Sequence, residues 1–181
     1  MQHIQAKKTP ENVTPILIDG TLHLVWTISE HGVPKPLLVN TNQTGVQYSA
    51  GDLATWAPIG SKQVELIGKD ERWSFTLVVG ISMSGEVLLF QAIYARKTSA
   101  LLPTSSAPNY TKATTELKFH FENSGNDTYW STIATMQSYV TNILAPYFES
   151  HHQKLNLSDQ LCIWQIDYWS VHKSIESHSW M

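Results

Sequence analysis

Two apolar segments, far apart in the sequence, place the strongest constraint on how this chain can fold. Residues 37–48 read LLVNTNQTGVQY, and residues 161–172 read LCIWQIDYWSVH. Each carries a polar residue near its end, as a core strand does when it presents a ligand at the edge of a sheet. The second segment offers the carboxylate of Asp167, whereas the first offers only the amide of Asn42. We expect the two segments to lie side by side, with Asn42 and Asp167 facing one pocket.

The first half of the chain predicts a short helix followed by strands. Residues 1–15 form a polar lead-in, and the apolar side of residues 16–29 predicts a helix that ends before Gly32. A buried strand is expected at residues 37–39. Three apolar segments follow, around residues 64–66, 75–79 and 87–94, and tight polar turns separate them. This pattern predicts an antiparallel meander of three strands.

The second half predicts a long helix and one further strand. Residues 97–109 are rich in Ser, Thr and Pro and indicate a surface loop. Asp127 is predicted to cap a helix that runs to about Glu149 and packs against a sheet. Pro146 should bend or loosen its last turn. The strand at residues 161–168 is expected to pair beside the first strand, with the helix as the crossover.

Composition limits the class of protein. The 181 residues and 42% hydrophobic content fit one domain, and a net charge of −3 gives no overall electrostatic footprint for nucleic acid. Cys162 is the only cysteine, which excludes a disulfide framework. The N-terminus lacks the apolar core of a signal peptide, and no apolar run approaches the ~20 residues that cross a bilayer. We therefore expect a soluble, intracellular protein that is not secreted and has no membrane partner.

Several phrases of the sequence resemble the catalytic domain of the DDE superfamily endonucleases, the pogo-like and mariner-like transposases related to centromere protein B. That family carries an Asp in a DQTG-type or DETG-type phrase on its first strand, matched here by NQTG at residues 42–45. A later strand ends in a hydrophobic-Asp phrase with a His shortly after, matched by WQID at residues 164–167 and by His172. Residues 46–72 and 75–98 also look like family segments, so the resemblance runs from about residue 20 to residue 181.

This resemblance implies an RNase H-like mixed sheet and metal-dependent cleavage or transfer of DNA strands. In such enzymes three carboxylates hold two divalent ions ~4 Å apart. Hard oxygen ligands suit Mg²⁺ or Mn²⁺. Asn42 and Asp167 would occupy two of the catalytic and metal positions. The implied partner is DNA, and the implied location is nuclear, with a cytoplasmic location as the alternative.

Two departures from the family predict that little or no catalysis survives. Asn42 brings no negative charge to a site that depends on carboxylates. The only acid after Asp167 is Glu176, which lies too close in sequence to stand on the separate element that the third acid requires. We therefore expect residues 1–181 to be a partial DDE-type endonuclease domain, incomplete at its C-terminus, that retains nucleic-acid binding at most.

Other interpretations of the same residues stay open. Asp167 can be an ordinary polar residue at a strand end, and Asn42 can shape an Asx turn before Gly45. The domain as a whole can instead be a non-enzymatic module that binds chromatin or another protein. A third possibility is a decayed gene product whose incomplete sheet exposes open edges and apolar surface.

Overall fold

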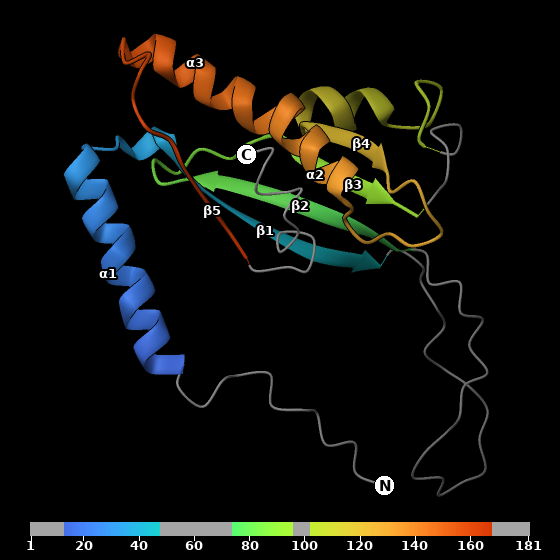
Figure 1. Ribbon diagram of the computed structural model, residues 1–181. Helices are drawn as coiled ribbons and strands as arrows, with labels where there is room; N and C mark the ends of the chain where they lie inside the picture. The colour runs from blue at the N-terminus through green and yellow to red at the C-terminus, as the bar shows by residue number, and fades with distance from the viewer. Residues whose placement is uncertain (1–12, 48–73, 96–101, 168–181) are drawn as a thin grey trace, which may run out of the picture.

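The structure, a computed structural model, describes residues 13–47, 74–95 and 102–167, which form a five-stranded sheet with helices (Figure 1). The strand order across the sheet is β4-β3-β2-β1-β5. The strands are β1 (Leu38–Gln47), β2 (Ser74–Ser82), β3 (Phe90–Tyr94), β4 (Phe119–Asn123) and β5 (Ile163–Ile166). Strands β1, β2 and β3 run antiparallel in turn, β4 runs parallel to β3, and β5 runs parallel to β1. The chain thus has the α/β class and the mixed sheet that the sequence predicts.

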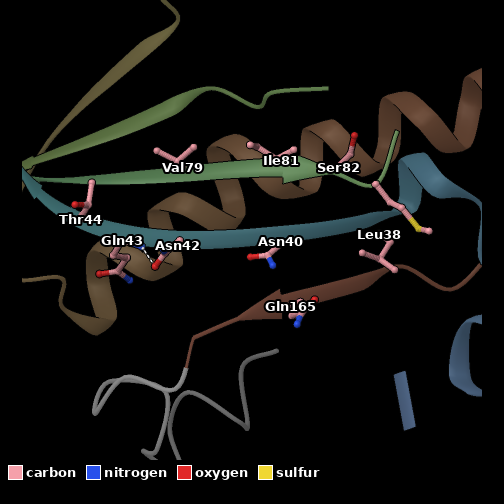
Figure 2. Close-up of a pocket in the computed structure, with 10 residues that line it drawn as sticks. Leu38, Asn40, Asn42, Gln43, Thr44, Val79, Ile81, Ser82 and Gln165 are labelled. Carbon is pink, nitrogen blue, oxygen red and sulfur yellow. Dashed lines mark hydrogen bonds between the residues drawn. The ribbon is translucent and has the colours of Figure 1, made fainter. Parts of the chain in front are cut away.

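The strand predictions are confirmed in part. Strands β2 and β3 overlap the segments predicted at residues 75–79 and 87–94. Strand β1 starts at Leu38 but continues to Gln47, and it pairs directly with β2, so it takes the first place in the antiparallel part (Figure 2). The strand expected around residues 64–66 lies outside the described residues. The parallel pairing of β5 beside β1 is confirmed.

Strand β4 is a correction to the expected topology. No strand is predicted there from the sequence, yet β4 extends the sheet beyond β3. A short π-helix, Lys112–Glu116, leads into it. The described part of the predicted surface loop, residues 102–109, does consist of turns and irregular backbone.

The helices lie on one face of the sheet and beside one edge. Helix α2 (Ile133–Tyr139), the π-helical segment Val140–Leu144 and helix α3 (Ala145–Leu155) follow one another and cover one face (Figure 1). Helix α1 (Val13–His31) contains the predicted helix and lies near β5. Among the described residues, none of the helices is long and apolar enough to cross a membrane.

The predicted start of the long helix is wrong. Helix α2 begins after Thr132, whose hydroxyl accepts a hydrogen bond from the Thr135 N–H, while the Thr135 hydroxyl accepts one from the Thr132 N–H. This reciprocal capping box satisfies two backbone donors at the helix start. Asp127 belongs to a preceding turn, in which the Asn126 side chain accepts the Thr128 N–H at 2.8 Å. Asn side chains favour such local turns, and this one delays the helix.

Pro146 does not end the helix, because a wider turn precedes it. The Ala145 N–H donates to the Val140 carbonyl, five residues back, and α3 then continues to Leu155. Proline lacks an N–H and its ring collides with the carbonyl four residues earlier, so it strains a regular α-helix. The π-helical segment widens the backbone at this point and accommodates the ring. The loosening expected at Pro146 is thus found one turn earlier.

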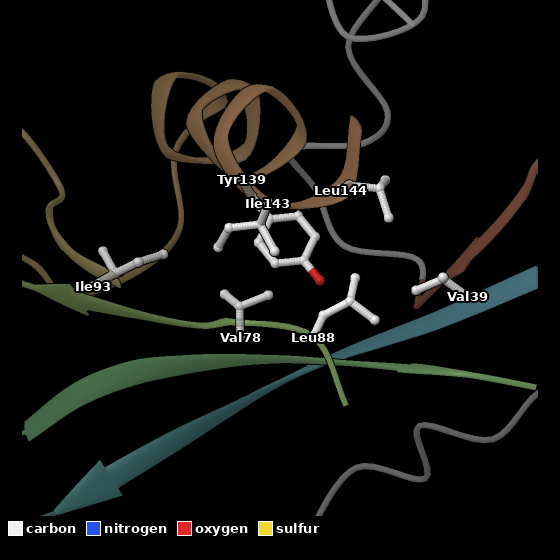
Figure 3. Close-up of a cluster of buried hydrophobic side chains, with 7 residues drawn as sticks. All are labelled: Val39, Val78, Leu88, Ile93, Tyr139, Ile143 and Leu144. Atoms are coloured by element: carbon white, nitrogen blue, oxygen red, sulfur yellow. The ribbon is translucent and has the colours of Figure 1, made fainter. Parts of the chain in front are cut away.

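The core lies between the covering helices and the sheet. Figure 3 shows Tyr139 projecting from α2 onto the sheet, where Val78 and Leu88 lie beneath it. The buried cluster consists of Val39, Val78, Leu88, Ile93, Tyr139, Ile143 and Leu144. The prediction that the long helix packs against a sheet is confirmed, since Met136, Ile143 and Leu144 are buried on it. Trp130 precedes α2 and is 49% exposed.

Candidate functional site

The β1–β5 pair brings Asn42 and Asp167 together. The parallel register places Thr41 opposite Ile166, and Asn42 and Asp167 are the next residues along the chain. Both are exposed, and both line one pocket of about 320 Å³. The structure therefore brings together the two residues that the sequence singled out.

The pocket opens on the face of the sheet that α2 and α3 leave uncovered. Along β1, Val39 and Thr41 are buried toward the core, whereas Asn40 and Asn42 alternate with them and are exposed. Gln165 lies opposite Asn40 in the parallel register, as Figure 2 shows. The exposed side of this strand pair thus presents three carboxamides and the Asp167 carboxylate.

The Asn42 side chain is held by the backbone N–H of the next residue. Its Oδ1 accepts a hydrogen bond of 2.8 Å from the N–H of Gln43 (Figure 2). A carboxamide oxygen has a second lone pair, which stays available for a cation or for another donor. A carboxylate at this position would accept the same N–H and would add a negative charge beside Asp167.

Gln43, the residue after Asn42, anchors β1 to the start of α2. Its Oε1 accepts a 2.6 Å hydrogen bond from the Ser131 hydroxyl, and its amide donates to the Met136 sulfur at 3.4 Å. Ser131 and Met136 are buried. Gln43 thus points toward the helices while Asn42 points away from them, which separates an anchoring residue from a site residue.

A buried network lies directly behind the pocket. The Trp164 indole N–H donates to the Thr41 hydroxyl oxygen at 2.9 Å, and the same oxygen lies 3.3 Å from the Tyr139 hydroxyl. The Tyr139 and Trp164 rings stack with their centroids 6.2 Å apart. Burial raises the pKa of Tyr139 above its ordinary value, against a smaller lowering by the hydrogen bond with Thr41. Sequence reasoning missed this network, although the alternation in WQID already places Trp164 and Asp167 on opposite faces.

A larger pocket of about 550 Å³ adjoins the first on the same face. Asn40, Asn42 and Gln165 line both pockets (Figure 2). The rest of the larger pocket is mainly apolar and includes Leu38, Val79, Ile81 and Met83. Its surface therefore combines an apolar floor with a rim of neutral hydrogen-bonding groups.

The donor set does not fit the two-metal arrangement that the family resemblance implies. Asp167 is the one carboxylate among the described residues that line the two pockets. Within residues 13–47, 74–95 and 102–167, no group of three or more His, Cys, Asp or Glu side chains is placed to hold a metal ion. The oxygen donors are of the type that Mg²⁺ prefers, but they carry a single charge. His172 and Glu176 lie outside the described residues.

A second polar cluster joins the β2–β3 turn to α3, and sequence reasoning did not find it. The Glu86 carboxylate lies 2.9 Å from the His151 Nε2 and accepts a 3.4 Å hydrogen bond from the Tyr147 hydroxyl. His151 is buried and its ring lies against that of Tyr147, with centroids 4.5 Å apart. Burial and the nearby Glu86 carboxylate raise the pKa of Tyr147, while the hydroxyls of Ser82 and Ser84 lower it. The cluster has the character of a tertiary anchor for α3.

In comparisons with known proteins, no family model, no curated protein and no solved structure matches this chain.

Proposed function

We propose that this chain is an RNase H-like, DDE-type endonuclease domain of transposase origin, whose present form binds nucleic acid with little or no catalysis. The observation that carries the proposal is the meeting of Asn42 and Asp167 in one pocket on neighbouring parallel strands. The topology supports it, because the resemblance implies three antiparallel strands followed by a strand parallel to the first.

The chemistry of the pocket is the reason for which we propose little or no catalysis. In-line displacement at phosphorus by this class of enzyme needs two divalent ions ~4 Å apart, each held by carboxylates. The Asn42 amide compensates no cation charge, and Asp167 is the one carboxylate among the described lining residues. We expect Mg²⁺ and Mn²⁺ to bind weakly and strand cleavage to stay at background.

The amides at the pocket rim are the groups that would contact nucleic acid. Carboxamides such as those of Asn40, Asn42 and Gln165 can donate to and accept from base edges. The described lining of the two pockets contains no Lys or Arg, so the phosphate contacts that make binding sensitive to salt would come from basic residues outside the lining. A domain with this role would act in the nucleus.

Metal binding tests the identity of the pocket. We compare Mn²⁺ affinity, measured by titration calorimetry, in Asn42→Asp and in the matched control Asn40→Asp. Both substitutions add one negative charge to the pocket that Asp167 lines. The register places position 40 opposite Gln165 and position 42 level with Asp167, so Asn42→Asp should bind Mn²⁺ at least about tenfold more tightly than Asn40→Asp. Equal affinities would remove the support for an ancestral metal position. Asn42→Asp alone should not restore nicking, since no third described carboxylate lines the pocket.

DNA binding and cleavage test the present activity. A labelled oligonucleotide titrated with the protein should bind at about 50 mM salt and weaken at about 200 mM. Incubation of supercoiled DNA with Mg²⁺ or Mn²⁺ should give no cleavage. Cleavage that disappears in Asp167→Ala would contradict the proposed loss of catalysis.

A second candidate function, a protein-interaction module without DNA binding, is favoured by the exposed apolar surface of α1. Leu17, Leu22 and Trp26 are each more than half exposed, and none of the side chains of this helix is buried. Large exposed apolar patches mark interaction sites. Failure to bind DNA at low salt would favour this candidate.

A further inference from the structure

A groove separates α1 from the outer edge of the sheet. It has a volume of about 350 Å³ and is lined by one side of α1 and by three consecutive residues of β5. The lining residues are Ile16, Leu17, Gly20, Thr21, Leu24, Ile163, Trp164 and Gln165. Successive residues of a strand point to opposite faces, so a groove that touches all three runs along the edge of β5.

The strand side of the groove is an open sheet edge. Within the described part of the chain, β5 pairs with β1 on one side and is the last strand of the sheet. An edge strand presents unpaired N–H and C=O groups that can accept another strand. Natural edges are often protected by Lys or Pro, and the sequence of β5, IWQI, contains neither.

The helix side of the groove is apolar and has room for side chains. Ile16 is 52% exposed and Leu17 is 63% exposed, although both line the groove. A Cβ atom added at Gly20 would meet no atom within 4 Å, so the middle of the groove is open. The described lining of the groove is mainly apolar and contains no ionisable side chain, which suits apolar peptide side chains.

We propose that this groove binds an extended apolar peptide segment of a partner protein, which adds as a strand beside β5 and packs its side chains on α1. Main-chain hydrogen bonds to an exposed edge and pockets for alternate side chains are the recurring features of such recognition. The negative charge at the end of β5 favours a peptide with a basic residue at one end. Asp167 directly follows β5, so a basic residue at the adjoining end of the peptide is favoured. Gln165 lines this groove and also both pockets, so the groove adjoins the nucleic-acid pocket across β5.

The test uses the full chain and a defined probe. The probe is a fluorescein-labelled hexapeptide with the sequence Val-Thr-Val-Ile-Val-Lys, followed by fluorescence anisotropy. It should bind the wild-type protein with a dissociation constant below about 1 mM. Gly20→Leu places a side chain in the open groove, and Gly20→Ala is the matched control, because both residues are good helix formers.

Gly20→Leu should weaken peptide binding at least about tenfold, whereas Gly20→Ala should stay within about threefold of the wild type. Circular dichroism should show both variants folded. A version of the probe with proline at its third and fifth positions, which removes N–H donors, should not bind. No binding below 1 mM, or equal binding by Gly20→Leu, would overturn the proposal. A wild-type dimer that Gly20→Leu dissociates, seen by sedimentation, would also overturn it and would name a second copy as the occupant.

Discussion

Among the described glycines, Gly80 is the one where a single added methyl group should perturb the core most directly. It lies on the inner face of β2, and a Cβ there would overlap the Tyr139 hydroxyl and lie 3.3 Å from the Leu88 Cδ2. Tyr139 is 0% exposed and its hydroxyl is held near Thr41, so it has little room to move aside. Overpacking of this kind costs about 1–3 kcal/mol. Gly80→Ala should therefore lower the free energy of unfolding by about 2 kcal/mol.

Urea denaturation of a double-mutant cycle tests whether the Tyr139 hydroxyl is the cause. Tyr139→Phe alone loses one long hydrogen bond and should cost about 0.5–1.5 kcal/mol. In the Gly80→Ala background the same change removes the overlapping atom, so the double variant should be about 1–2 kcal/mol more stable than additivity predicts. The control is Gly45→Ala on β1, where an added Cβ meets nothing within 4 Å and should be neutral or stabilising. Additive losses in the cycle, or a neutral Gly80→Ala, would refute this reasoning.

Three further outcomes are expected from the described contacts. Glu86→Gln and His151→Gln should each lower the free energy of unfolding by roughly 0.5–1 kcal/mol, because Glu86 is half-exposed and this limits the strength of the pair. The two losses should be coupled in the double variant, and additive losses would exclude the contact. Thr132→Ala removes the acceptor of the capping box and should cost about 0.5–2 kcal/mol, and an unchanged urea midpoint would contradict that helix start. The pKa values of Tyr139 and Tyr147 are raised by burial, so the folded state keeps protons that the unfolded state loses. Their contribution to the free energy of unfolding should then be fully present below about pH 10 and fall as the pH rises further. Tyr139→Phe should reduce this alkaline loss of stability, measured by chemical denaturation at several pH values. An unchanged pH dependence would argue against the buried hydroxyl.

Much of the sheet follows from local sequence patterns. The apolar segments around Val39, Val78 and Ile93 are short, bounded by turn residues and rich in β-branched side chains, so they predict strands β1, β2 and β3. The long polar and helical stretch between β3 and β5 makes a parallel crossover the natural connection. The meeting of Asn42 and Asp167 follows from that topology.

Other features depend on tertiary context and could not be predicted. Strand β4 reads FHFEN, and its five residues are all half-buried, so no buried face distinguishes it from a loop until β3 pairs with it. Asp127 is a good capping residue, but the Asn126 turn and the reciprocal threonines at the start of α2 compete with it. The Gly20 groove needs the position of α1 against β5, which no periodicity in the sequence specifies.

The hydrogen bond from Trp164 to Thr41 has a consequence for the opposite side of the sheet. A strand that slips by one residue exchanges its two faces. If β5 slipped in this way, the indole would be forced into water and the Asp167 carboxylate into the apolar interior beneath α2. The hydrogen bond of the indole therefore fixes the alignment of β1 and β5. Asn42 and Asp167, on the exposed face, owe their positions to this buried contact, in which neither takes part.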